Sequence, residues 1–156
     1  MNKIKKVIKK LIPKRYRKSA IEWKNLIFDG YATKSYSQEG EDMILRRLFE
    51  EQKTGFYVDV GAHHPMRFSN TYYFYKKGWR GMNIDAMPGS MELFKKIRPR
   101  DINLEIAISD KKQVLTYYIF NEPALNGFSK ELSAKRNGKR RYRIIDEIKM
   151  ETSTLA

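Results

Sequence analysis

The residues best suited to chemistry lie in the segment Asp59-Val60-Gly61-Ala62-His63-His64-Pro65, at the end of an apolar run. A glycine after a strand lets a ligand approach the backbone, and the start of a following helix offers free amide donors. Only one glycine is present here, whereas a dinucleotide site uses the Gly-x-Gly-x-x-Gly pattern that admits a pyrophosphate. The turn therefore predicts a site for a ligand without a pyrophosphate and disfavours NAD.

Two carboxylates stand at the ends of predicted neighbouring strands. Asp85 follows Gly61 by 24 residues, where an acid in a Rossmann-like sheet accepts hydrogen bonds from ribose hydroxyls. The alternative is that Asp85 only caps the helix that begins near Pro88. Asp59 lies inside an apolar strand, and because an unpaired buried carboxylate is costly, it needs a partner such as a ligand ammonium group.

His63 and His64 are the only histidines in the chain. A neutral imidazole beside a reacting hydroxyl can accept its proton, so both residues are candidate catalytic bases. The alternative is that both are polar loop residues that line a pocket. No metal site is predicted, because adjacent histidines seldom reach one ion, no clear third ligand is visible and the chain has no cysteine.

Strands and helices alternate around these residues. The pattern predicts strands at 56–60, 80–85 and 102–108, with helices at 72–77 and 89–97 between them. Crossovers of this kind are right-handed and produce a parallel sheet that binds ligands at the carboxyl ends of its strands. The first strand lacks strict alternation, which indicates burial on both faces. The predicted fold class is therefore α/β, a Rossmann-like sheet with helices on both faces.

The flanking segments are assigned by the same patterns. A helix is predicted from Ser37, and a strand at 114–120 is expected to be antiparallel and appended to the main sheet. A loop and polar surface follow at 121–143, then a strand at 144–154. The basic run at 135–143 is expected to form a solvated turn, and the alternative is that it contacts phosphates. Residues that select an acceptor are expected in the loop 121–128.

Positive charge is concentrated at the N-terminus. Residues 1–18 carry nine Lys or Arg and no acid, which leaves +5 of the total net charge of +14 for the rest. No specific nucleic-acid partner is therefore predicted. Apolar residues at helical spacing in 3–12, with lysines opposite, predict a basic amphipathic helix that either lies on an anionic membrane surface or packs on protein.

The chain is predicted to have two parts, a basic amphipathic segment at 1–18 and a partial Rossmann-like domain at 19–156. The absence of cysteine favours a reducing compartment, and no apolar run of about 18 residues exists to span a membrane. A secretory signal is not predicted either. We therefore expect a cytoplasmic protein, with peripheral contact at the inner membrane face if the segment 3–12 binds lipid.

Four ordered motifs resemble those of the FkbM-type methyltransferases: Tyr36–Asp42, Phe56–Ala62, Gly78–Asp85 and Ala107–Asp110. The resemblance covers about residues 35–155. It implies an S-adenosylmethionine-dependent O-methyltransferase that modifies a hydroxyl of a small molecule or glycan, such as a sugar, a polysaccharide or a related metabolite. A further glycine of the family's first loop is absent, and Pro65 stands in its region.

The resemblance also implies roles for individual residues. Asp59, Gly61 and Ala62 match the first cofactor motif, and Asp85 matches the acid that binds the ribose. Ser109 and Asp110 fall where such enzymes contact adenine, and Ser69 and Asn70 are expected near the methionyl carboxylate.

The family domain continues further than this chain, with a fourth strand and an acidic motif expected shortly after Leu155. We therefore expect the C-terminal strands of the sheet to be missing and the open sheet to favour self-association. The alternative function is a catalytically silent, truncated fragment that binds a membrane surface or a protein partner.

Overall fold

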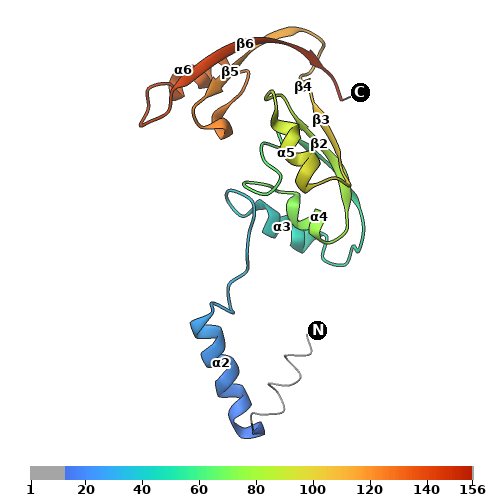
Figure 1. Ribbon diagram of the computed structural model, residues 1–156, viewed down its shortest axis with the longest axis vertical. Helices are drawn as coiled ribbons and strands as arrows, with labels where there is room; N and C mark the ends of the chain where they lie inside the picture. The colour runs from blue at the N-terminus through green and yellow to red at the C-terminus, as the bar shows by residue number, and fades with distance from the viewer. Residues whose placement is uncertain (1–12, 156) are drawn as a thin grey trace. The chain divides into compact units, whose positions relative to one another are not determined.

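A computed structural model describes residues 13–155, and the predicted helix at 3–12 lies outside them. The chain divides into two units, one up to Lys34 and one from Ser35 onward. The described part of the first unit contains the 3-10 turn η1 (Lys14–Tyr16) and the helix α2 (Arg17–Ile27), as Figure 1 shows. The predicted domain boundary at 18/19 falls within α2. No helix in residues 13–155 is long and apolar enough to cross a membrane.

The second unit contains a parallel sheet of β1 (Phe56–Val60), β2 (Arg80–Asp85) and β3 (Ile102–Glu105), in the order β1-β2-β3. The helices α4 (Tyr72–Lys76) and α5 (Ser90–Ile97) connect these strands. This confirms the predicted alternation of strand and helix and the parallel pairing. Consecutive parallel strands place their carboxyl ends at one edge, which is the edge that holds the candidate site.

The predicted strand at 102–108 is wrong as a single element. It is divided into β3 and the short strand β4 (Ala107–Ile108), and β4 pairs with β6 (Ile144–Ser153) in a different sheet. The alternating apolar residues in 102–108 are compatible with one strand, but alternation does not say which partner each half pairs with. The pairing of β4 is set by residues of β6 that lie more than 40 positions further along the sequence.

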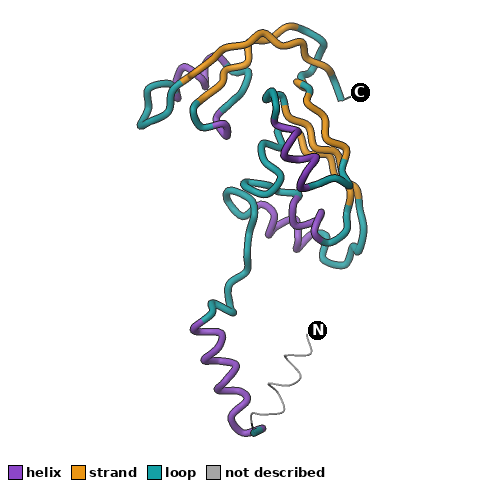
Figure 2. The backbone as a smooth tube through the Cα atoms, in the orientation of Figure 1, coloured by secondary structure: helices purple, strands orange, loops and turns teal. Residues whose placement is uncertain are grey.

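The second sheet has the order β4-β6-β5, and β5 (Val114–Phe120) is antiparallel to β6. The strands predicted at 114–120 and 144–154 are confirmed, but they form this separate sheet rather than an extension of the first. Figure 2 shows the two strands side by side. The predicted loop 121–143 contains two short helices, η2 (Pro123–Leu125) and α6 (Lys130–Arg136), with Ser129 capping the second.

One face of β1 is left uncovered. Tyr57 and Asp59 point toward the side of α4 and α5, whereas Phe56, Val58 and Val60 on the opposite face are 59%, 52% and 48% exposed. The prediction that this strand is buried on both faces is therefore wrong. The physical reason is topological: right-handed crossovers that step in one direction across a sheet place both connecting helices on the same face.

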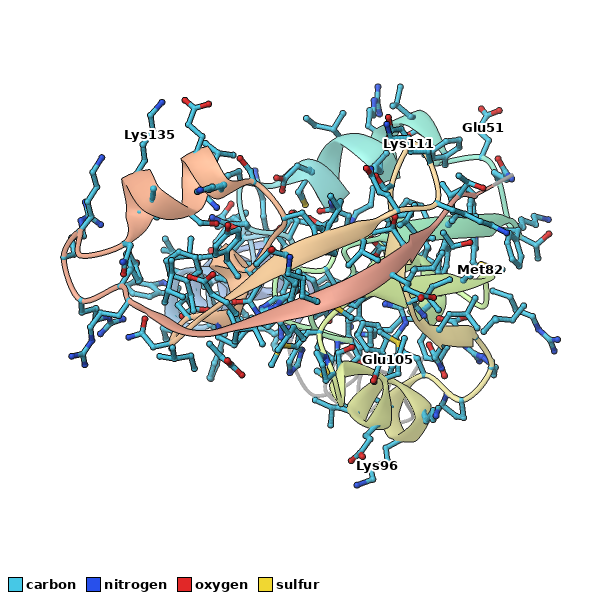
Figure 3. The ribbon with its side chains drawn as sticks, turned by 90° about the horizontal axis from the view of Figure 1, so that it is seen from above. Glu51, Met82, Lys96, Glu105, Lys111 and Lys135 are labelled. Carbon is cyan, nitrogen blue, oxygen red and sulfur yellow. The ribbon has the colours of Figure 1, made fainter. Side chains whose placement is uncertain are left out.

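The helix α5 packs on the sheet through a narrow apolar stripe. Met91 and Phe94 are fully buried and form a cluster with Ala62, the residue after Gly61. Lys96 points away from the sheet in Figure 3, as the solvated face of an amphipathic helix does. The turn that holds the candidate site is thus anchored to the core by its own alanine.

A buried arginine ties the elements of the parallel sheet together. Arg98, which follows α5, is inaccessible to solvent and donates from Nε to Asp101 at 2.8 Å. Its Nη2 atom donates to the Tyr57 hydroxyl at 2.7 Å and to Thr71 Oγ1 at 3.0 Å. Asp101 also accepts a hydrogen bond from Asn83 Nδ2 at 3.0 Å. This network joins β1, β2 and the starts of α4 and β3, and the sequence patterns did not indicate it.

A second buried carboxylate explains the motif at 36–42. Asp42 lies in the first turn of α3 (Glu41–Leu48) and accepts hydrogen bonds from Ser35 Oγ, from the Tyr36 amide at 3.1 Å and from Ser37 Oγ at 2.9 Å. It also pairs with Arg46. Burial by itself would raise the pKa of Asp42, but these hydrogen bonds and the arginine outweigh it and lower the pKa. The motif therefore fixes the segment before α3 onto that helix.

Replacing Asp42 with asparagine is expected to lower the free energy of unfolding by about 1–3 kcal/mol at pH 7, because the donors around it lose a charged acceptor. The pKa of Asp42 in the folded chain lies below the unfolded value of about 3.9. The stabilisation by ionised Asp42 is therefore fully present above a pH of about 3.9 and is lost as the pH falls through the folded-state pKa. Urea unfolding at pH 7 and pH 3 measures both effects. The control is Glu50→Gln, which removes an exposed ion pair with Arg47. Equal effects of the two substitutions would contradict a special role for Asp42.

Candidate functional site

A cavity of about 300 Å³ lies at the carboxyl ends of β1 and β2. The turn after β1 and the residues after β2 form one wall, and β5 with the segment 123–128 forms another. In parallel α/β sheets this is the edge where ligands bind. The lining residues are Val60, Gly61, His63, Ile84, Asp85, Ala86, Met87, Ile106, Ile108, Tyr117, Pro123, Ala124, Asn126, Gly127 and Phe128.

Gly61 lines the cavity in a conformation that suits glycine. Its φ is +76°, which side chains rarely adopt, and its amide donates to the Ile84 carbonyl at 2.8 Å. A Cβ atom built at this position would meet no other atom within 4 Å. The space beside the backbone of this cavity-lining residue is therefore open, as expected for a ligand turn.

Asp85 is 7% exposed and lines the same cavity. Its Oδ2 atom accepts a hydrogen bond from the His63 amide at 2.8 Å, and its Oδ1 atom accepts one from the Met87 amide at 2.8 Å. The N-cap of α5 is Gly89, so Asp85 does not cap that helix. Each carboxylate oxygen has a second lone pair available for a ligand donor.

His63 is the histidine that lines the cavity. Its φ is +55°, in the left-handed region that non-glycine residues seldom occupy, and the hydrogen bond from its amide to Asp85 holds it there. Burial lowers the pKa of His63 below its usual 6.5, and the Arg67 guanidinium lowers it further, while Asp85 and Glu122 oppose the shift. At pH 7 the imidazole is therefore neutral and has one nitrogen able to accept a proton.

Replacing Arg67 with glutamine is expected to raise the pKa of His63. The substitution removes the nearby positive charge, and it also frees Glu122, which Arg67 holds at 3.2 Å, to attract the protonated imidazole. NMR titration of the two histidine ring signals, assigned with a His63→Asn variant, measures the change. A matched control is Arg47→Gln, an exposed arginine paired with Glu50. If the His63 pKa in Arg67→Gln stays at the wild-type value, the electrostatic role of Arg67 is wrong.

Whereas His63 lines the cavity, His64 makes hydrogen bonds within its own loop. Its Nδ1 atom accepts hydrogen bonds from the Met66 amide at 3.0 Å and from the Arg67 amide at 2.9 Å. Burial is the first cause that lowers its pKa. The ring therefore shapes the turn, and it does not line the cavity. Of the two predicted catalytic bases, the geometry favours His63, and the catalytic role of either residue stays a prediction.

Four other residues that the family resemblance assigns to the cofactor site do not line the cavity. They are Asp59, Ala62, Ser69 and Asn70. Asp59 Oδ2 accepts a hydrogen bond from Thr71 Oγ1 at 2.7 Å, and burial raises its pKa. Ser69 is 1% exposed, and its Oγ atom accepts from the Tyr72 amide at 3.1 Å. Asn70 is half-buried beside it. Asp59 and Ser69 thus have partners within the chain, and the methionyl contacts stay predictions.

Ser109 and Asp110 belong to a turn after β4. Ser109 Oγ donates to Asp110 Oδ1 at 2.9 Å, and Gln113 Nε2 donates to both residues. The neighbouring Ile108 lines the cavity, whereas Ser109 and Asp110 do not. The implied contacts of these two residues with adenine therefore stay predictions.

Several cavity residues were not singled out from the sequence. Tyr117 on β5 packs its ring 4.8 Å from the ring of Phe128, and burial, with the nearby Asp85 charge, raises its pKa to about 12. Asn126 accepts from the Phe120 amide at 2.8 Å and lies 3.3 Å from the Met87 sulfur. The only sequence signal was the predicted acceptor loop at 121–128, and most of its residues from Pro123 onward do line the cavity.

Comparison with known proteins identifies the family to which these elements belong. Residues 59–156, more than half of the chain, match the family model described as the methyltransferase FkbM domain. The match begins at Asp59 and includes Gly61, His63, Asp85 and the cavity wall from β5. No match was found among curated proteins or among solved structures. The chain therefore belongs to the FkbM methyltransferase family.

Proposed function

We propose that this methyltransferase uses S-adenosylmethionine to methylate a hydroxyl oxygen of a sugar, a polysaccharide or a related metabolite. The observation that carries the proposal is the buried carboxylate of Asp85 at the cavity, next to the open space beside Gly61. A volume of about 300 Å³ lies at the lower end of the range for small-molecule sites. A single glycine, without a pyrophosphate-binding pattern, suits a nucleoside cofactor.

Different residues of the cavity would contact different parts of the proposed cofactor. Asp85 would accept hydrogen bonds from the two ribose hydroxyls, since each of its oxygens keeps one lone pair. Ile106 and Ile108 offer apolar surface beside it for a flat base. Gly61 lets the backbone approach the ligand without a side chain in between.

The bound cofactor supplies an electrophilic methyl group on a sulfonium. The imidazole of His63 would accept the proton that the acceptor hydroxyl loses when it takes up this methyl group. His63 suits this role because its lowered pKa leaves it neutral at pH 7. Positioning of the acceptor matters more than a strong base, because methyl transfer requires mainly an aligned in-line approach. The segment 123–128, which lines the same cavity as His63, is the proposed place for acceptor contacts.

Isothermal titration calorimetry with S-adenosylmethionine tests the proposal on the full chain. Saturable binding at one site is expected, with similar binding of the demethylated product, S-adenosylhomocysteine, and none of NAD. The alternative, a catalytically silent binding module, predicts no heat with either nucleoside. Absence of binding by the folded wild-type chain would contradict the proposed function.

A further inference from the structure

The helix α2 has an apolar stripe that no other described residue of its own unit, 13–34, covers. Tyr16, Ala20, Trp23 and Ile27 follow one another at intervals of three or four residues, so they lie on one side of the helix, with Leu26 beside them. Trp23, Leu26 and Ile27 are 66%, 68% and 68% exposed, and no residue of α2 is buried. Large apolar side chains gathered in this way indicate an interaction surface.

Basic residues surround this stripe. Residues 13–34 contain six Lys or Arg against two acids, Glu22 and Asp29. At 100° per residue, Lys24 and Arg17 lie along one border of the apolar stripe. Arg15, in the 3-10 turn η1 that precedes α2, lies toward the other border, where Glu22 also lies. Long basic side chains at such borders can extend toward anionic groups while their methylene stems stay on the apolar surface. A helix with Trp and Leu on one side and Lys and Arg along its borders is typical of binding in the plane of an anionic bilayer.

We propose that α2 binds the surface of an anionic lipid bilayer, with Trp23, Leu26 and Ile27 inserted at the headgroup level. An indole is well suited to this depth, because its ring is apolar and its N–H is polar. The excess of positive charge favours anionic lipid over a neutral apolar surface of another protein. Eleven residues extend only about 16 Å, so the helix lies in the interface rather than across the membrane. The proposal rests on residues 13–34 alone and is independent of the methyltransferase site.

Tryptophan fluorescence of the full chain tests this directly, because the two tryptophans differ in exposure. Trp23 is 66% exposed and Trp79 is 6% exposed, so a Trp79→Phe variant reports on Trp23 only. Phosphatidylglycerol vesicles are expected to shift the Trp23 emission to shorter wavelength and protect it from iodide. Phosphatidylcholine vesicles are expected to produce a much smaller change. If the Trp23 emission is unchanged by phosphatidylglycerol vesicles, or is already shielded without them, the proposal is wrong.

Vesicle co-sedimentation separates α2 from the basic segment that precedes it. The double substitution Trp23→Ser with Leu26→Ser is expected to weaken binding to phosphatidylglycerol vesicles by at least about tenfold, because it removes two of the large apolar side chains of the stripe. Replacing Arg15 and Lys24 with glutamine is expected to cost about fivefold per charge. The control is Ile145→Ser, which changes an apolar residue of similar exposure, 64%, on β6. Binding that survives the Trp23 and Leu26 substitutions unchanged would overturn the role of α2. Unchanged circular dichroism confirms that the variants fold.

Discussion

Replacing Asp85 with alanine is expected to lower the affinity of the chain for S-adenosylmethionine by about 100-fold or more, as measured by isothermal titration calorimetry. Hydrogen bonds to a charged acceptor contribute roughly 1.5–3 kcal/mol each, and the proposed site would lose two of them. The prediction rests on the proposed function. It is specific, because Asp85 is the only carboxylate among the described residues (13–155) that line the cavity.

Asp85 also holds the backbone of His63 and Met87, so the substitution needs a structural control. Asp85→Asn keeps one oxygen acceptor and the shape of the side chain, and an intermediate loss of affinity is expected. Glu92→Ala removes an exposed carboxylate on α5 and is expected to change nothing. Wild-type affinity in Asp85→Ala, with a wild-type melting temperature, would rule out the ribose role. A wild-type chain that does not bind at all instead contradicts the proposed function itself.

Replacing Arg98 with methionine is expected to lower the free energy of unfolding by about 3–5 kcal/mol, because it leaves the buried Asp101 carboxylate without its cation. Asp101 and Arg98 are both buried, and the guanidinium also donates to Tyr57 and Thr71. A typical domain has only about 5–15 kcal/mol of stability, so a loss of this size is a large part of the total. Urea denaturation followed by circular dichroism measures it.

The matched control is Arg100→Met, two positions further along the chain. Arg100 is exposed, donates to the Tyr75 carbonyl at 2.6 Å and stacks on the Tyr75 ring. Because solvent screens it and no buried charge depends on it, a cost below about 1 kcal/mol is expected. If the two substitutions lower the free energy of unfolding equally, the buried hydrogen bonds and ion pair of Arg98 do not stabilise the chain as proposed.

Part of the fold and of the site could be predicted from the sequence because the determining forces are local. The limits of β1 and β2 follow from apolar runs that end at Gly61 and Asp85. The parallel pairing follows from the helix between successive strands, which returns the chain to the same edge of the sheet. The position of the ligand turn follows from the same two facts. Even the left-handed conformation of Gly61 is indicated by the residue type.

The uses of the polar residues could not be predicted in this way, because they depend on partners distant in the sequence. Ser69 and Asp59 have the residue types of ligand contacts, yet Ser69 is bonded by Arg98, 29 positions away, and Thr71, which binds Asp59, is bonded by the same arginine. Two adjacent histidines look equivalent in the sequence, but only His63 reaches the cavity, because His64 is turned back to accept from the amides of its own loop.

The sequence by itself therefore determined where the candidate site lies: at the turn after β1 and at Asp85, at the carboxyl edge of a parallel sheet. Only the tertiary structure decided which side chains face the cavity, which strand β4 joins and which surfaces stay open. The physical reason is the range of the interactions. Backbone conformation and the handedness of the crossovers are set by residues close together in the sequence. Burial and hydrogen-bond pairing are set by residues that come together only when the chain folds.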